Sequence, residues 1–75
     1  MRQEEKEKVK IIFANFFGVS PFRIDESQSI YEQFDADIVD VKELSWILSE
    51  AYHITITEDD VVSVNSVCNL LKKNI

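Results

Sequence analysis

The sequence predicts an all-α fold: a small four-helix bundle with three longer helices, a short third helix and a long loop between the first two. Three observations support it. Apolar residues recur at helical spacing in three segments, capping and turn residues stand between these segments, and no stretch has the pattern of paired strands. We expect residues 1–75 to form a single domain, because this length cannot supply two independent cores.

The first helix is expected from about Gln3 to Phe17. Its apolar residues fall in one stripe at i, i+3, i+4, i+7 and i+8, namely Val9, Ile12, Phe13, Phe16 and Phe17. Gly18 is suited to end this helix, because glycine adopts the left-handed conformation at little cost. Ser20-Pro21 then stops the helix from continuing.

The connection from Gly18 to Ala36 is too rich in apolar residues for a solvated linker. It carries Ile24, Ile30, Tyr31 and Phe34. We therefore expect it to fold back over the bundle and to join the core.

The second helix is expected from about Asp37 to Tyr52. Asp37 precedes it and can cap its free N–H groups. At 100° per residue, one face of this helix is apolar, with Ile47 at its edge. That face consists of Val41, Leu44, Leu48 and Ala51.

A short third helix and a last helix are predicted from capping residues. His53 to Ile56 is expected to be a loop or a short extended piece. Thr57 and Asp60 stand at capping-box spacing, which predicts a helix through about Ser63. The last helix is expected to be capped by Asn65 or Ser66, and its inner face to carry Val67, Leu70 and Leu71.

Negative charge is concentrated in the middle of the chain. The net charge is −6, and between Ile24 and Leu71 the only base is Lys42. Such a surface repels nucleic acid and anionic membranes, whereas it favours a basic protein surface as partner. The alternative is that these acids only keep the domain soluble. The eleven acids of this span are Asp25, Glu26, Glu32, Asp35, Asp37, Asp40, Glu43, Glu50, Glu58, Asp59 and Asp60.

Membrane insertion and an internal disulfide are not expected. No apolar run approaches the roughly 20 residues that cross a bilayer. The first ten residues lack the apolar stretch of a signal peptide, and the single Cys has no partner in the chain. We therefore expect a cytoplasmic protein, and a monomer.

The segment from Phe34 to Val41, Phe-Asp-Ala-Asp-Ile-Val-Asp-Val, resembles the segment in which acyl carrier proteins present the serine that holds their prosthetic group. That family typically has Leu-Gly-Ala-Asp-Ser-Leu-Asp there. The resemblance covers about residues 8 to 73 without a gap and implies a four-helix bundle. Further matching segments are Phe17-Gly18-Val19, Ser29-Ile30-Tyr31-Glu32-Gln33-Phe34, Glu43-Leu44 and Ile54-Thr55-Ile56-Thr57-Glu58.

Two residues depart from the family pattern. Asp35 replaces a glycine, which is expected to affect the loop before the second helix. Ile38 replaces the serine whose hydroxyl, in the family, forms the phosphodiester link to 4′-phosphopantetheine. That chemistry needs a nucleophilic heteroatom, which isoleucine lacks. Ser45 and Ser49 lie two and three turns further along the helix, and Ser29 lies in the preceding loop. We therefore expect no cofactor, no catalytic residues and no enzymatic activity.

The resemblance also implies a partner-binding surface on the second helix. Val39 and Trp46 lie opposite Leu44 and Leu48 on the helical wheel, and the family uses apolar residues at these two positions, flanked by acids, to dock basic grooves. We expect Trp46 to be exposed, although the long loop could instead cover it. Lys42 departs from the apolar residue common in the family. The predicted partner-binding residues are Asp37, Val39, Asp40, Lys42, Glu43, Trp46 and Glu50.

The remaining candidate residues favour structural roles. Glu58, Asp59 and Asp60 could hold a divalent cation against Asp35 or Asp37, but acids at a helix start are the favoured interpretation, and we expect no metal site. Cys68 is expected to be buried, and His53 to be an ordinary loop residue.

Four hypotheses for the function follow. The leading one is a degenerate acyl carrier protein that docks noncovalently on a synthase, ligase or transferase-type protein. The second is a genuine acyl or peptidyl carrier of fatty-acid, polyketide or related synthesis whose serine has been altered. The third is a lipid-binding bundle with a cavity lined by Phe13, Phe16, Leu44 and Leu48. The fourth is an unrelated acidic inhibitor of a basic enzyme.

Overall fold

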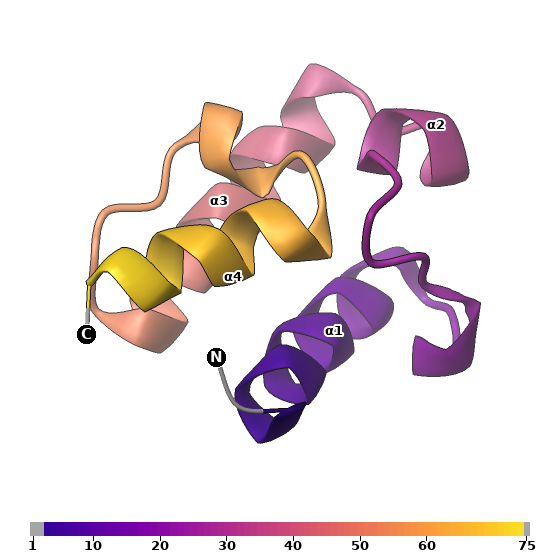
Figure 1. Cartoon of the computed structure of the whole chain (residues 1–75). Coiled ribbons are helices and arrows are strands. Elements are labelled where there is room, and N and C mark those ends of the chain that lie inside the picture. Colours follow the sequence, from indigo (N-terminus) through magenta and orange to yellow (C-terminus); the bar gives the residue numbers. More distant parts are fainter. Residues whose placement is uncertain (1–2, 75) are drawn as a thin grey trace.

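Helices form all the regular structure of residues 3–74, the part of the chain that this computed structural model describes. The α-helices are α1 (Gln3–Phe17), α2 (Ile30–Phe34), α3 (Ile38–Tyr52) and α4 (Val64–Lys73). Two 3₁₀ turns, η1 (Pro21–Arg23) and η2 (Glu58–Val61), lie in the connections. The predicted all-α class and four-helix bundle are confirmed (Figure 1).

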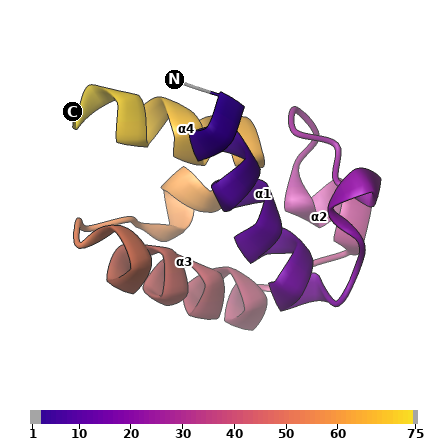
Figure 2. The ribbon, with the colours of Figure 1, turned by 90° about the horizontal axis from the view of Figure 1, so that it is seen from below.

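The core lies where α1 meets α3 and α4. Seen from below, α1 crosses between these two helices, and α2 stands to one side (Figure 2). The turn η2 fills the space between α3 and α4 and contacts both. The largest completely buried side chains come from every one of these elements: Phe13, Ile30, Leu44, Leu48, Val9, Val41, Val61, Val64 and Val67.

The bounds predicted for α1 are confirmed. Val9 and Phe13 of its apolar stripe are completely buried, and Ala14 joins them. The other stripe residues, Ile12, Phe16 and Phe17, are partly buried against the core. Gly18 follows the helix with a φ of 68°, the left-handed conformation that its lack of a side chain allows.

The connection from residue 18 to residue 36 folds back over the bundle, as predicted, but it is not simply a loop. It contains α2, which Ser29 caps by accepting a hydrogen bond from the Glu32 N–H at 3.1 Å. Ile30 is buried and Phe34 stacks on Phe17 with ring centroids 4.4 Å apart. Tyr31 was expected in the core but is 44% exposed, because it lies on the other side of this single-turn helix.

Polar contacts hold this connection against the rest of the molecule. The Ile30 N–H donates to the Val62 carbonyl at 2.8 Å, and the Asn65 N–H donates to the Glu26 carbonyl at 2.9 Å. The Glu26 carboxylate also pairs with Lys10 at 3.2 Å and Lys6 at 3.6 Å, both on α1. The connection therefore bridges α1 and α4.

The inner face of α3 is as predicted except at its end. Val41, Leu44 and Leu48 are completely buried, but Ala51 is exposed. Ala51 lines an open hollow beside α1 instead of lying under another element, which explains the difference. Ser45, which was not predicted on this face, is buried, and its hydroxyl donates to the Lys42 carbonyl at 2.8 Å.

The capping box predicted at the third helix is confirmed, whereas the cap predicted for α4 is wrong. The Asp60 carboxylate accepts hydrogen bonds from the Thr57 N–H and hydroxyl, both at 2.9 Å. The helix α4 starts at Val64, and Ser63 is its cap. Ser63 and Ser66 each accept the other's backbone N–H, at 3.0 and 3.1 Å, so Ser66 is the inner partner of this box and not the cap.

None of the helices in the described residues combines the length and the apolar character needed to pass through a lipid bilayer.

Candidate docking surface on α3

A reciprocal capping box fixes the start of α3. The Asp40 N–H donates to Asp37 Oδ1 at 3.0 Å, and the Asp37 N–H donates to Asp40 Oδ2 at 3.1 Å. Both carboxylates thereby satisfy N–H groups that have no partner within the helix, and they complement its dipole. Asp37 and Asp40 therefore have a local structural role in addition to any role in docking.

Ile38 is the first residue of α3, and its side chain is 53% exposed. It is followed by Val39, which is 56% exposed. In the first turn of α3, these two neighbouring side chains present hydrocarbon to solvent, with the Asp37 and Asp40 carboxylates beside them. Ile38 was not among the predicted contact residues, but its exposure adds it to this surface.

The three serines that could be considered in place of residue 38 are held by local hydrogen bonds. Ser29 caps α2, and Ser45 is buried. Ser49 Oγ accepts the Ile56 N–H at 2.9 Å and lies 2.8 Å from the Ser45 carbonyl, so it joins α3 to the segment that precedes η2. None of these three hydroxyls occupies the start of α3.

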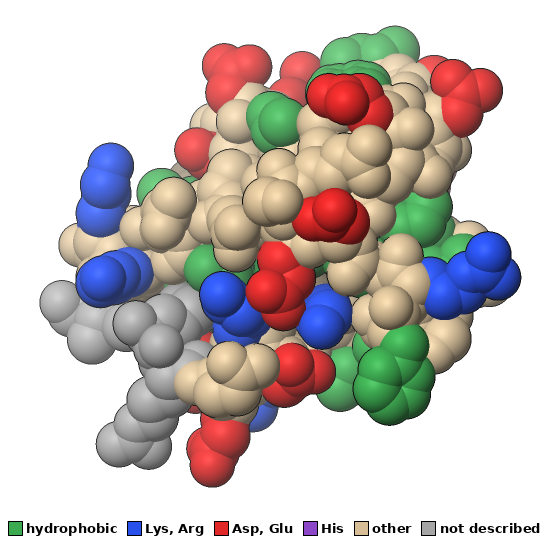
Figure 3. All heavy atoms as spheres, turned by 45° about the vertical axis from the view of Figure 1, so that its right-hand side comes forward, with side chains coloured by type: hydrophobic (Ala, Val, Ile, Leu, Met, Phe, Trp, Pro, Cys, Tyr) green, Lys and Arg blue, Asp and Glu red, His purple; other side chains and the backbone are tan. Residues whose placement is uncertain are grey.

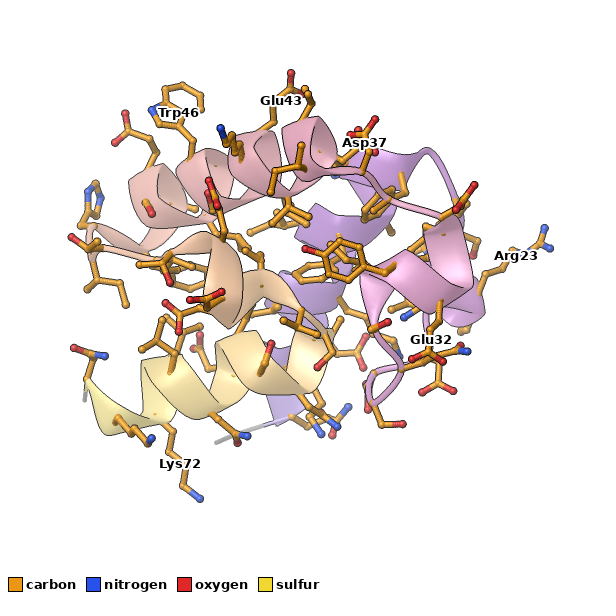
Figure 4. The ribbon with its side chains drawn as sticks, turned by 90° about the horizontal axis from the view of Figure 1, so that it is seen from above. Arg23, Glu32, Asp37, Glu43, Trp46 and Lys72 are labelled. Atoms are coloured by element: carbon orange, nitrogen blue, oxygen red, sulfur yellow. The ribbon has the colours of Figure 1, made fainter. Side chains whose placement is uncertain are left out.

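Trp46 stands on the solvent side of α3 and is 65% exposed, so the long connection does not cover it. In the view from above, Asp37, Glu43 and Trp46 all project away from the bundle along the outer edge of α3 (Figure 4). Lys42, Glu43 and Glu50 are exposed too, and Asp40 is half-buried. The structure thus brings the predicted residues together on one helix. We call Ile38, Val39, Lys42, Glu43, Trp46 and Glu50 the α3 surface.

Acidic side chains predominate around this end of the molecule. On the face drawn in Figure 3, acidic side chains lie across the upper part, between patches of hydrophobic side chains, and others lie lower down, beside the lysines and arginines. Three of the lysines, Lys6, Lys8 and Lys10, make ion pairs within or next to α1. Lys42 is the only lysine or arginine within α3.

The residues that were proposed to line a lipid cavity belong to the packed hydrophobic core. Phe13, Leu44 and Leu48 are completely buried and Phe16 is partly buried. A surface hollow of about 400 Å³ lies elsewhere, between α1 and the last turn of α3. It is shallow, and its lining residues are Glu5, Lys8, Ile11, Ile12, Ala51 and Tyr52.

The other candidate residues have structural surroundings. Cys68 is 5% exposed, as expected, and its burial raises the pKa of the thiol. His53 ends α3 with a φ of 58°. Within residues 3–74, no three acidic, cysteine or histidine side chains come together in an arrangement that could hold a metal ion.

Sequence comparison decides the family. No family model matches the chain. The acyl carrier protein of Chlamydia muridarum, however, is 34% identical over 67 residues, which are 89% of this chain and 87% of that protein. The chain belongs to the acyl carrier protein family. The acyl carrier protein of Chlamydia trachomatis serovar D is 33% identical over the same shares, and that of Buchnera aphidicola subsp. Baizongia pistaciae is 29% identical over 97% of both chains.

Membership of the acyl carrier protein family confirms the resemblance on which the sequence predictions relied. Acyl carrier proteins are carriers and not enzymes, and their prosthetic group is 4′-phosphopantetheine. At the start of α3, Ile38 has no heteroatom, and the neighbouring Asp37 and Asp40 carboxylates are engaged in the capping box.

Proposed function

We propose that this chain is a degenerate acyl carrier protein that does not take 4′-phosphopantetheine and acts by noncovalent docking of the α3 surface on a partner protein. The observation that carries the proposal is the presence of an isoleucine, Ile38, at this position. It stands at the exposed start of α3, where the sequence resemblance aligns it with the serine of the family.

The loss of covalent attachment rests on the chemistry of this residue. A phosphodiester link requires an oxygen that can attack coenzyme A's phosphate. Isoleucine offers only hydrocarbon. The nearby hydroxyls are engaged elsewhere: Ser29 caps α2, Ser45 is buried and bonds the Lys42 carbonyl, and Ser49 binds the backbone of Ile56. No other residue replaces the missing nucleophile at the start of α3.

Noncovalent docking rests on exposure and charge. Ile38, Val39 and Trp46 leave more than half of their side chains exposed on one helix, and large exposed aromatics are typical anchors of protein interfaces. Glu43 and Glu50 lie beside Trp46 and are exposed as well. A partner with an apolar recess and basic side chains beside it fits this surface, and the complementary electric fields of the two proteins speed and orient their encounter. A synthase, ligase or transferase-type protein is the class of partner that we propose.

Intact-mass spectrometry tests the covalent part. The purified chain is incubated with coenzyme A and a broad-specificity phosphopantetheinyl transferase, beside a serine-bearing acyl carrier protein as positive control. We expect the mass of this chain to stay unchanged while the control gains one phosphopantetheine. A stoichiometric gain on the unaltered chain would contradict the proposal.

Two variants complete this experiment. Ile38→Ser restores the hydroxyl, and Ile38→Ala removes the same apolar side chain without supplying an oxygen. If Ile38→Ser alone is modified, the remaining surface still binds the transferase, and the attachment residue is the only part that has been lost. If neither variant is modified, the chain has diverged from carriers in its transferase-binding surface as well.

A further inference from the structure

The position of Lys42 on α3 points to a more specific partner. We propose that the partner surface is two-sided: an apolar recess receives Val39 and Trp46, basic side chains face Glu43 and Glu50 on one flank, and an acidic side chain faces Lys42 on the other. This inference rests on the proposed function, since it describes the protein that docks on the α3 surface.

Helix geometry separates the charges on the α3 surface. Val39 and Trp46 are seven residues apart and therefore lie almost on one line along the helix. At 100° per residue, Glu50 and Glu43 are turned about 40° and 60° from Trp46 in one direction, whereas Lys42 is turned about 40° in the other. The apolar ridge thus has acids on one flank and a lysine on the opposite flank.

Lys42 has no acidic partner among residues 3–74. The residues three and four positions away, which are its neighbours on the helix, are Ile38, Val39, Ser45 and Trp46, and none is acidic. Within the described residues, no carboxylate lies within ion-pairing distance of its ammonium group, including those of η2, whereas Lys6, Lys8 and Lys10 all have partners. Lys42 is exposed, so its charge is free for a partner.

A uniformly basic partner would fit this surface poorly. Docking would bring its cations close to Lys42, and like charges at an interface oppose binding and select against that partner. An acidic group at this point removes the repulsion and adds an ion pair. The acidic group of the partner also fixes the orientation of α3 on the partner surface. If the helix were reversed end for end, its two flanks would be exchanged and Lys42 would face the basic side chains of the partner.

Two synthetic helical peptides provide a defined probe. Both carry a row of Leu and Phe with Lys and Arg along one flank, and they differ only at one central position of the opposite flank, which is Glu in the first peptide and Gln in the second. Each is titrated at low ionic strength into the full ¹⁵N-labelled chain. We expect both to shift the amide signals between Val39 and Glu50, and the Glu peptide to bind roughly threefold more tightly, as an exposed ion pair would produce.

Lys42→Gln and Lys72→Gln supply the matched variants. Lys72 is an exposed lysine of α4, on the side of the molecule opposite Trp46 (Figure 4). In Lys42→Gln the two peptides should bind equally, whereas Lys72→Gln should keep the difference. Equal binding to the unaltered chain, or a difference that persists in Lys42→Gln, would overturn the two-sided partner and leave the docking surface standing. Peptides that shift no α3 signals would instead count against the docking surface itself.

Discussion

One residue with a positive φ, Asp35, shapes the approach to α3. Asp35 ends α2 with φ 54° and ψ 40°, and this left-handed step allows the Ala36 N–H to reach the Ile30 carbonyl at 3.4 Å. The chain then enters the capping box of Asp37. Asp35 stands where the family resemblance has glycine. An aspartate tolerates the left-handed conformation better than most residues, which is consistent with its place at this step.

Replacing Asp35 by glycine should stabilise the chain. We expect Asp35→Gly to raise the free energy of unfolding by about 0.5–1 kcal/mol, because glycine adopts a positive φ without steric cost. Asp35→Val should lower it, since a β-branched residue is strained there. Urea unfolding followed by circular dichroism measures both. Asp35→Asn is the control for charge, and equal stability of the Gly and Val variants would contradict this interpretation.

At the scale of elements, the connection between α1 and α3 is held by polar groups as much as by apolar ones. The Gln33 side chain accepts from the Asp25 N–H at 2.9 Å and donates to the carbonyls of Asp25 and Gln28, both at 2.8 Å. The Ser27 hydroxyl and N–H donate to the Asp25 carboxylate and hold its pKa below the usual value. These bonds close the loop that leads into α2.

Removing the Gln33 amide should loosen this loop. We expect Gln33→Ala to lower the free energy of unfolding by about 1 kcal/mol, since three partly solvated hydrogen bonds are lost. Amide hydrogen exchange at Asp25 should accelerate in the folded state. Gln28→Ala is the control, because the Gln28 side chain makes no hydrogen bond within residues 3–74. Equal effects of the two substitutions would show that Gln33 does not hold the loop.

At the scale of the whole molecule, acids and exposed apolar side chains share α3, whereas three of the lysines are bound in ion pairs of α1. An exposed tryptophan costs a folded protein hydrophobic stabilisation that burial would provide. Trp46 is the single tryptophan of the chain, so its fluorescence reports on the α3 surface alone.

The fluorescence of Trp46 should be that of an indole in water. We expect its emission maximum to change little when urea unfolds the chain, and acrylamide to quench it efficiently in both states. A core tryptophan would show a large red shift on unfolding. Trp46→Phe should change the free energy of unfolding by less than about 0.5 kcal/mol, because the side chain packs little. A pronounced red shift would contradict the exposure of this residue.

Residues whose roles depend on near neighbours could be predicted from the sequence. The bounds of α1, the Asp37 cap of α3 and the Thr57–Asp60 pair are of this kind, since periodicity and caps act over one or two turns. The family resemblance and the position of Ile38 on it were also present in the sequence. The exposure of Val39 and Trp46 followed from the helical wheel.

The tertiary structure alone decided which of the remaining side chains were covered. A single turn such as α2 is too short to show a helical period, so the sequence could not separate the buried Ile30 from Tyr31, which is 44% exposed. Ala51 has the right place on the wheel but borders a hollow. Both Ser63 and Ser66 have side chains that could cap the start of α4. Ser63 is the cap because the chain enters the helix there, shortly after η2. Caps and periods act along the chain, whereas burial depends on how distant segments meet in space.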